Sequence, residues 1–291
     1  MKILKGSFAS GVRLYRNALI AILFAGLVVR SGATIYTIGN GAGYNAQFDS
    51  SSASFIGWTV GINQLVAESL YYSVDNGPVM SLTALGFTSA GKTSVGSTIY
   101  DWTIKYGVGQ AVTVYDHVLL TSPNVMNQTF TVFNNDLSGA HTVSLFQYFN
   151  FDLGGSPASQ NLILTPAGNN STTAAALQTG GGATLNWSGF ISGINPGATT
   201  EVQADNSGAL FGAFLGNPSP NSLDNVTLTA SGSGTDFGYE FDVPLAAGAA
   251  YGVSEVGSIV MVPEPSSVAL ISSGMLVLAL TFRSRRSKKL D

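Results

Sequence analysis

Apolar and polar residues alternate along much of the chain between residues 34 and 262. In the clearest case, residues 236–243, every second residue is aromatic or aliphatic, and the residues between them include Asp236, Glu240 and Asp242. A period of two residues is typical of a β-strand that buries one face. We therefore predict a half-buried strand there, with its carboxylates on a solvated outer face.

The same pattern recurs between clusters of glycine, proline, asparagine and aspartate, which favour turns. It predicts twelve further strands, at residues 54–62, 70–74, 79–88, 98–106, 111–120, 129–133, 142–151, 161–165, 183–187, 199–203, 226–230 and 251–256. Long amphipathic helical patterns are missing, and only the alanine-rich residues 174–177 predict a short helix. Many short strands separated by turns indicate an all-β domain, a β-sandwich or jelly roll.

The N-terminal end differs from this body in charge and hydropathy. Five Lys and Arg residues lie in residues 1–33, where an apolar run at 18–29 is followed by small residues that end at Ala33. This order is typical of a secretory signal peptide, and we predict signal peptidase cleavage after Ala33. An uncleaved N-terminal anchor is the alternative.

At the C-terminal end, Pro263, Glu264 and Pro265 precede an uncharged run at residues 266–282 and a basic tail at 283–291. The prolines favour a stiff, extended peptide. As a helix, the uncharged run would be roughly 25 Å long, close to the ~30 Å hydrocarbon core of a bilayer. The basic residues after it predict that the tail stays cytoplasmic and that the body faces outward. An ordinary membrane anchor is the alternative.

These three parts, in this order at a C-terminus, resemble the PEP-CTERM sorting signal of Gram-negative bacteria. The resemblance implies that a membrane-embedded exosortase recognises Pro263, Glu264 and Pro265, removes the tail and releases or transfers the protein to the outside. Residues 132–155 and 241–248 also resemble stretches of PEP-CTERM surface proteins, the second as their last hairpin. The expected organisation is a signal peptide at 1–33, an exported β-sandwich at 34–262 and a sorting signal at 263–291 that anchors the chain transiently in the inner membrane.

The body between the two basic ends is strongly acidic. It holds 14 carboxylates against Lys92 and Lys105, which gives a net charge of −12. Because such a charge repels phosphate backbones and anionic lipid surfaces, we expect no nucleic-acid partner. The chain has no cysteine, which excludes a disulfide framework, a thiolate nucleophile and a zinc–cysteine site.

The two histidines, His117 and His141, are weak candidates for chemistry. No Gly-x-Ser-x-Gly elbow supplies a serine for a hydrolytic triad. A metal site formed by both histidines with Asp116 has no supporting spacing, and the loops at 134–136 and 224–225 lack the Asp-x-Asp-x-Asp-Gly pattern of a calcium loop. Residues 86–93 match the letters of a P-loop, but their context favours a glycine-rich turn between strands. We therefore assign no metal ligand and expect no cofactor.

Paired carboxylates could serve a glycosidase. Acids with aromatic neighbours are the candidates: Asp101, Asp116, Asp152, Glu240 and Asp242. On one strand face, Glu240 and Asp242 would lie about 7 Å apart, within the range that glycoside hydrolysis uses. Such pairs are common in acidic β proteins, so we assign no catalytic residue and interpret the chain as not an enzyme.

Two sets of residues relate the body to glycans. Trp58, Trp102 and Trp187 are candidates for a sugar-stacking platform, with core packing as the alternative. Candidate glycosylation sites are the Asn-x-Ser/Thr sequons at Asn127, Asn169, Asn170, Asn186 and Asn225. With the sorting signal, the expected function is a structural protein of the cell surface or of an exopolysaccharide or biofilm matrix. The alternatives are a glycan-binding sandwich and a carbohydrate-active enzyme.

Overall fold

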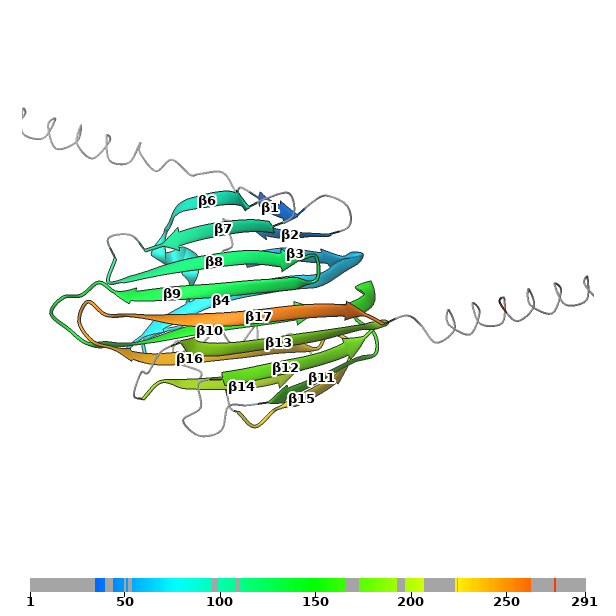
Figure 1. The fold of residues 1–291 in the computed structure, drawn as a ribbon. Coiled ribbons are helices and arrows are strands. Elements are labelled where there is room, and N and C mark those ends of the chain that lie inside the picture. The colour runs from blue at the N-terminus through cyan, green and yellow to red at the C-terminus, as the bar shows by residue number, and fades with distance from the viewer. Residues whose placement is uncertain are drawn as a thin grey trace, which may run out of the picture. The chain divides into compact units, whose positions relative to one another are not determined.

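The computed structural model describes a body made almost entirely of β-strands. It covers residues 35–39, 44–49, 51, 54–95, 99–107, 110–165, 173–192, 197–206, 223, 225–262 and 275, with backbone only for 36, 44, 87–95 and 99–102. Every strand pair in this part is antiparallel, and the strands form two sheets (Figure 1). The prediction of an all-β sandwich is therefore confirmed for the described body.

The first sheet, sheet A, contains eight strands within the described residues. In spatial order they are β1 (Ile35–Gly39), β2 (Tyr44–Asp49), β3 (Ser54–Val60), β4 (Ile62–Val74), β10 (His141–Phe151), β16 (Asp236–Leu245) and β14 (Thr199–Asp205), with β5 (Met80–Ser81) paired to β4.

The second sheet, sheet B, contains nine strands within the same part of the chain. Their order is β15 (Thr229–Gly232), β11 (Gln160–Thr165), β12 (Thr173–Gly180), β13 (Ala183–Ser192), β17 (Ala250–Met261), β9 (Val125–Asn134), β8 (Val112–Ser122), β7 (Ile99–Tyr106) and β6 (Phe87–Val95).

The chain passes repeatedly from one sheet to the other. Strand β9 pairs with β8 and β17 in sheet B, whereas the next strand, β10, pairs with β4 and β16 in sheet A. Strands β16 and β17 likewise belong to different sheets. The hairpin expected at residues 241–248 is therefore wrong, and both connections are crossovers that tie the two sheets into one sandwich.

Three local predictions also differ from the structure. Residues 174–177, predicted as a helix, lie in strand β12, where pairing with β11 and β13 outweighs the helix propensity of alanine. The strand predicted at 79–88 is interrupted by a 3-10 helix, η1 (Leu82–Leu85). The residues with P-loop letters enter strand β6 rather than a turn, so no helix N-terminus is available for a phosphate. A second 3-10 turn, η2 (Leu153–Gly155), follows β10.

An aromatic cluster fills the space between the sheets. Phe237, Tyr239 and Phe241 of β16 point inward as predicted and are fully buried. Phe149 lies 4.6 Å from Trp187 and 4.9 Å from Phe237 between ring centroids. These contacts join β10 and β16 of sheet A to β13 of sheet B, and the sandwich core is built on them.

Candidate functional site

Several predicted site residues lie outside the described residues. They are Ala33, the sorting motif Pro263, Glu264 and Pro265, the sequons at Asn169 and Asn170, and the side chain of Trp102. The predicted membrane helix at 266–282 also falls there, apart from Met275, which is helical. Among the described residues, no helix has the length and apolar character to cross a membrane. Export and processing therefore stay predictions.

Two of the tryptophans proposed for sugar stacking are core residues. Trp58 is 0% exposed and Trp187 is 2% exposed, and their rings meet edge to face at 6.2 Å. The Trp187 indole N–H donates a hydrogen bond to Glu255 Oε2 at 3.2 Å. The glycan-stacking interpretation is wrong for both residues, because the core needs their apolar area.

The described sequons differ in accessibility. Asn186 is exposed on β13, whereas Asn127 on β9 is half-buried and donates to Thr121 Oγ1 at 3.4 Å. The Asn225 side chain accepts a hydrogen bond from the Val202 backbone N–H at 2.8 Å. Of these three, Asn186 offers a glycosyl group the most space.

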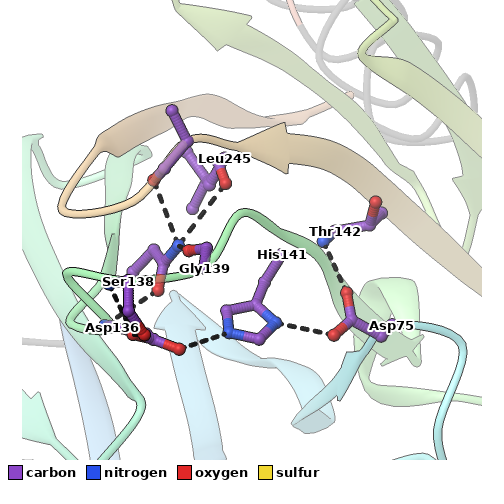
Figure 2. Close-up of polar contacts among 9 residues, drawn as sticks. Asp75, Asp136, Ser138, Gly139, His141, Thr142 and Leu245 are labelled. Carbon is purple, nitrogen blue, oxygen red and sulfur yellow. Dashed lines mark hydrogen bonds and ion pairs between the residues drawn. The ribbon is translucent and has the colours of Figure 1, made fainter.

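His141 holds two loops together instead of joining His117 and Asp116. Figure 2 shows its ring between two carboxylates, with Nδ1 2.6 Å from Asp75 Oδ2 and Nε2 3.2 Å from Asp136 Oδ2. The hydrogen bonds to Asp75 and Asp136 raise the pKa of His141 above its usual value. Hydrogen bonds from Ser138 hold the pKa of Asp136 at about 2.

The ion pairs of His141 are complete over a limited pH range. Their contribution to stability is lost at low pH when the carboxylates protonate, and at high pH when His141 deprotonates above its raised pKa. His117 lies on β8 with its side chain on the outer face, while the neighbouring Asp116 points inward. No group of metal ligands forms among the described residues. The cluster of Figure 2 is therefore a structural clamp between the turn after β4 and the start of β10.

Polar side chains of the loop that follows β9 form hydrogen bonds within this loop and with residues at the end of β16. Asn134 Nδ2 donates to the carbonyl oxygens of Gly139, Leu245 and Ala246, and Asp136 Oδ1 accepts from the backbone N–H and the hydroxyl of Ser138. These oxygen-rich residues are used for closing the loop.

The predicted carboxylate pair of β16 is not on a solvated face. Glu240 is 3% exposed, and its Oε2 accepts from the Leu223 N–H at 2.7 Å. Burial and the neighbouring Asp242 raise the pKa of Glu240 to about 9. The prediction of a solvated outer face is therefore wrong here, because the outer side of sheet A is covered by a second apolar cluster of Tyr71, Phe146, Tyr148 and Leu223.

The same pair is a proton donor beside an acceptor. Burial raises the pKa of Asp242, and hydrogen bonds that its carboxylate accepts from the Ser144 hydroxyl, from Glu240 and from the Thr199 hydroxyl offset part of this rise. Because the two carboxyl groups are hydrogen-bonded to each other, they are closer than the ~5–9.5 Å that separates a pair flanking a glycosidic bond. A glycosidase pair is therefore not formed, although proton transfer at a single oxygen would suit the arrangement.

A polar cluster that the sequence analysis missed lies between the sheets. We call it the inter-sheet acid cluster, and it consists of Glu68 on β4, Asp116 on β8, Gln128 on β9, Gln147 on β10 and Glu255 on β17. Gln147 Nε2 donates to Glu68 Oε1 at 2.6 Å, and Gln128 Nε2 donates to Glu68 Oε1 and Asp116 Oδ1, both at 3.2 Å. Both sheets contribute, so the cluster exists only in the folded sandwich.

The sequence pattern of alternating apolar and polar residues contains an indication of this cluster. Each of its five residues occupies an inward position of its strand, in phase with buried apolar residues such as Val253 beside Glu255. A charged or amide side chain at a core position indicates a buried polar site.

The outer side of sheet B has a different character. We call the outward positions of β8, β9, β11, β12, β13 and β17 the sheet B face. It contains no Asp, Glu, Lys or Arg: Tyr115, His117, Leu119, Val125, Asn127, Thr129, Thr131, Phe133, Asn161, Ile163, Thr165, Thr173, Ala175, Leu177, Thr179, Thr184, Asn186, Ser188, Phe190, Ser192, Gly252, Ser254, Val256, Ser258 and Val260. Hydroxyl and amide groups on this face are interspersed with apolar side chains.

Aromatic rings mark one part of the sheet B face. Tyr115 and Phe133 meet edge to face at 5.4 Å, and Lys105 Nζ of β7 lies 4.6 Å from the Tyr115 ring centroid. Phe190, further along the face, is 40% exposed. Rings and hydroxyl groups on an open sheet are the side chains that contact the apolar faces and hydroxyls of sugars.

Comparisons with known proteins find similar solved structures but no match by sequence. No family model and no curated protein sequence matches the chain. Among solved structures, a bacterial glucoamylase complexed with acarbose is similar with a TM-score of 0.50 and 10% identity, covering 84% of this chain and 36% of that one. A GalM/aldose epimerase homologue from C. elegans has a TM-score of 0.45 and 10% identity, covering 79% of this chain and all of that one. Heparan sulfate lyase HepC from Pedobacter heparinus has a TM-score of 0.39 and 9% identity, covering 86% and 40%.

These similarities correct one expectation. A fold similar to this sandwich occurs in the glucoamylase, which contradicts the prediction that the chain is not an enzyme, a prediction that rested on how common such carboxylate pairs are. The chain spans about a third of the glucoamylase. At these identities, the likeness shows the fold alone.

Proposed function

We propose that this chain is an exported carbohydrate-binding protein that contacts its glycan through the sheet B face. The observation that carries the proposal is the uncharged, hydroxyl-rich surface of six neighbouring strands, with Tyr115, Phe133 and Phe190 on it. Carbohydrate binding needs exposed rings and hydrogen-bonding groups that lose little on desolvation. The carbohydrate-active proteins with a similar sandwich support the same class of ligand.

The negative charge of the body favours an uncharged glycan over a polyanionic one. The body carries a formal net charge of −12, and it stays negative when the buried acids with raised pKa values, such as Glu240, are protonated. Glu201 is one of the acidic side chains on the outer side of sheet A. A polyanionic glycan would be repelled by this field, while an uncharged glycan meets no repulsion at the sheet B face. The proposed ligand is therefore a neutral polysaccharide.

Export is part of the proposal, and the sequence of the two chain ends supports it. The predicted signal peptide at 1–33 and the PEP-CTERM-like tail at 263–291 support delivery of the sandwich to the cell surface or medium by an exosortase. An extracellular polysaccharide matrix would then be the setting in which the sandwich meets its glycan.

Replacing rings on the sheet B face is expected to weaken glycan binding. Each of Tyr115→Ala and Phe190→Ala removes a stacking contact of about 0.5–1.5 kcal/mol, which raises the Kd about twofold to tenfold. Calorimetric titration of the full chain with neutral and polyanionic polysaccharides measures this effect. The same mixtures are assayed for release of reducing sugar, which would reveal cleavage of the glycan in addition to binding.

The control for this experiment is Val66→Ser, a change at an exposed apolar position of β4 in sheet A. It should leave the Kd unchanged. Equal weakening by all three variants, or tighter binding of the polyanionic glycans, would contradict the proposed face.

The sorting motif has its own test. In cells of the source organism, the intact mass of the exported protein is expected to lack residues 1–33 and part or all of the tail. A variant with Pro263, Glu264 and Pro265 all replaced by alanine is expected to keep the tail, because the extended recognition peptide is lost. Mass spectrometry of surface and medium fractions makes the comparison, and a tail kept in both proteins would reject exosortase processing.

A further inference from the structure

The inter-sheet acid cluster contains more acceptors than donors. The side-chain amide of Gln128 donates to Glu68 and Asp116, and that of Gln147 donates to Glu68 and to Gln128 Oε1 at 3.2 Å. Four fully buried oxygens are still without a partner: Glu68 Oε2, Asp116 Oδ2, Gln147 Oε1 and Glu255 Oε1. An acceptor left unpaired in a core costs free energy, so this arrangement calls for further donors.

Within the described part of the chain, no positive charge supplies those donors. The titratable groups that face the cluster are Glu68 from β4, Asp116 from β8, Glu255 from β17, Tyr106 from β7 and Tyr239 from β16. Strands β9, β10 and β13 contribute Gln128, Gln147 and Trp187, which do not titrate. The described residues place Lys105 on the outer face, above Tyr115, and group no metal ligands here.

A protonated carboxyl group would supply the missing hydrogen-bond donor and would also remove the uncompensated negative charge from the core. Protonation turns an acceptor oxygen into an O–H donor and removes a buried negative charge. We propose that the inter-sheet acid cluster is a proton-binding site whose carboxyl groups donate hydrogen bonds between the sheets, and that loss of these protons loosens the sandwich. The proposal rests on the geometry of the core and is independent of glycan binding.

The expected pKa values agree with this geometry. Burial raises the pKa of Asp116 to about 7 and that of Glu255 to about 8, and burial with the nearby Asp116 raises the pKa of Glu68 well above its usual value. In the unfolded chain these groups ionise near pH 4. Between about pH 4 and these raised values the folded state binds more protons, so stability falls as pH rises.

The test is the pH dependence of unfolding. Between about pH 5 and pH 7, the unfolding constant of the full chain is expected to rise by up to about tenfold per pH unit for each carboxyl that stays protonated. Glu255→Gln and Asp116→Asn imitate the neutral carboxyl group. Each variant is expected to reduce the rise of the unfolding constant by up to about tenfold per pH unit relative to wild type. The surface variant Asp49→Asn is the matched control and should keep the wild-type slope.

Three outcomes would overturn the proposal. They are equal slopes in wild type, Glu255→Gln and Asp116→Asn, a slope lost equally in Asp49→Asn, and stabilisation by added calcium that a chelator reverses. The last outcome would mean that a cation takes the place of the protons.

A spectroscopic measurement covers the case in which the core variants fail to fold. In a background with both Glu240→Gln and Asp236→Asn, which removes two buried acids on the outer side of sheet A, the folded protein is expected to show the infrared band of protonated carboxyl groups at neutral pH. The band should disappear on titration above about pH 8, together with tertiary structure. Its absence at neutral pH would refute proton binding.

Discussion

Replacing Trp187 by alanine is expected to lower the free energy of unfolding by about 3–5 kcal/mol. The indole is 2% exposed and lies between Trp58, Phe149 and Phe151, with ring centroids 6.2, 4.6 and 5.9 Å away. Its loss leaves a cavity where the two sheets meet and removes the N–H donor of Glu255. Denaturant unfolding monitored by circular dichroism measures the change.

The matched control is Phe190→Ala on the same strand. Phe190 lies three residues further along β13, on the outer face, and is 40% exposed. Its removal creates no internal cavity, so its cost should stay near or below about 1 kcal/mol. Equal losses from the two variants would show that β13 does not bury Trp187 between the sheets.

Replacing Gly154 by alanine is the second change with a large expected effect, a loss of about 2–5 kcal/mol. Gly154 in η2 has a φ of 72°, which costs an alanine about 1–2 kcal/mol. An added Cβ would also overlap the backbone of Gly181, in the turn between β12 and β13. Relieving this overlap adds about 1–3 kcal/mol, because two backbones cannot move aside as a flexible side chain does.

Gly61→Ala separates the two contributions. Gly61 has a similar φ of 75°, but its added Cβ would meet nothing within 4 Å. Its cost should therefore be the conformational part alone, about 1–2 kcal/mol. Thermal unfolding of both variants makes the comparison, and equal losses would contradict the close approach of η2 to the β12–β13 turn.

The alternation predicts strands best where one face is buried and the other is open. Strands β8, β9, β13 and β17 follow the pattern almost residue by residue, as in the alternating burial of β9. Strand β12 was mistaken for a helix, because its alanines carry little strand propensity and its pairing with β11 and β13 is a long-range interaction. Strands β1 and β2 were not predicted, since the turn-rich segment around them hides their short pattern.

For the candidate sites too, some features could be predicted from the sequence and others depend on the tertiary structure. An acid at an inward strand position was visible at Glu68, Asp116 and Glu255, yet nothing local shows that these three meet. Their strands come together only because β4 lies in sheet A while β8 and β17 lie in sheet B, packed on it. The carboxylates of β16 were correctly placed opposite its aromatics, but the cover over Glu240 was not predicted, because Leu223 comes from a distant loop.

By itself, the sequence determined the all-β class of the body, its acidic charge and the inward or outward side of most strand residues. These properties depend on composition and on a period of two residues, both of which are local. The tertiary structure decided which strands share a sheet, which acids meet between the sheets and that Trp58 and Trp187 belong to the core. Those outcomes depend on pairing and packing between residues tens to hundreds of positions apart, for which a local pattern carries no information.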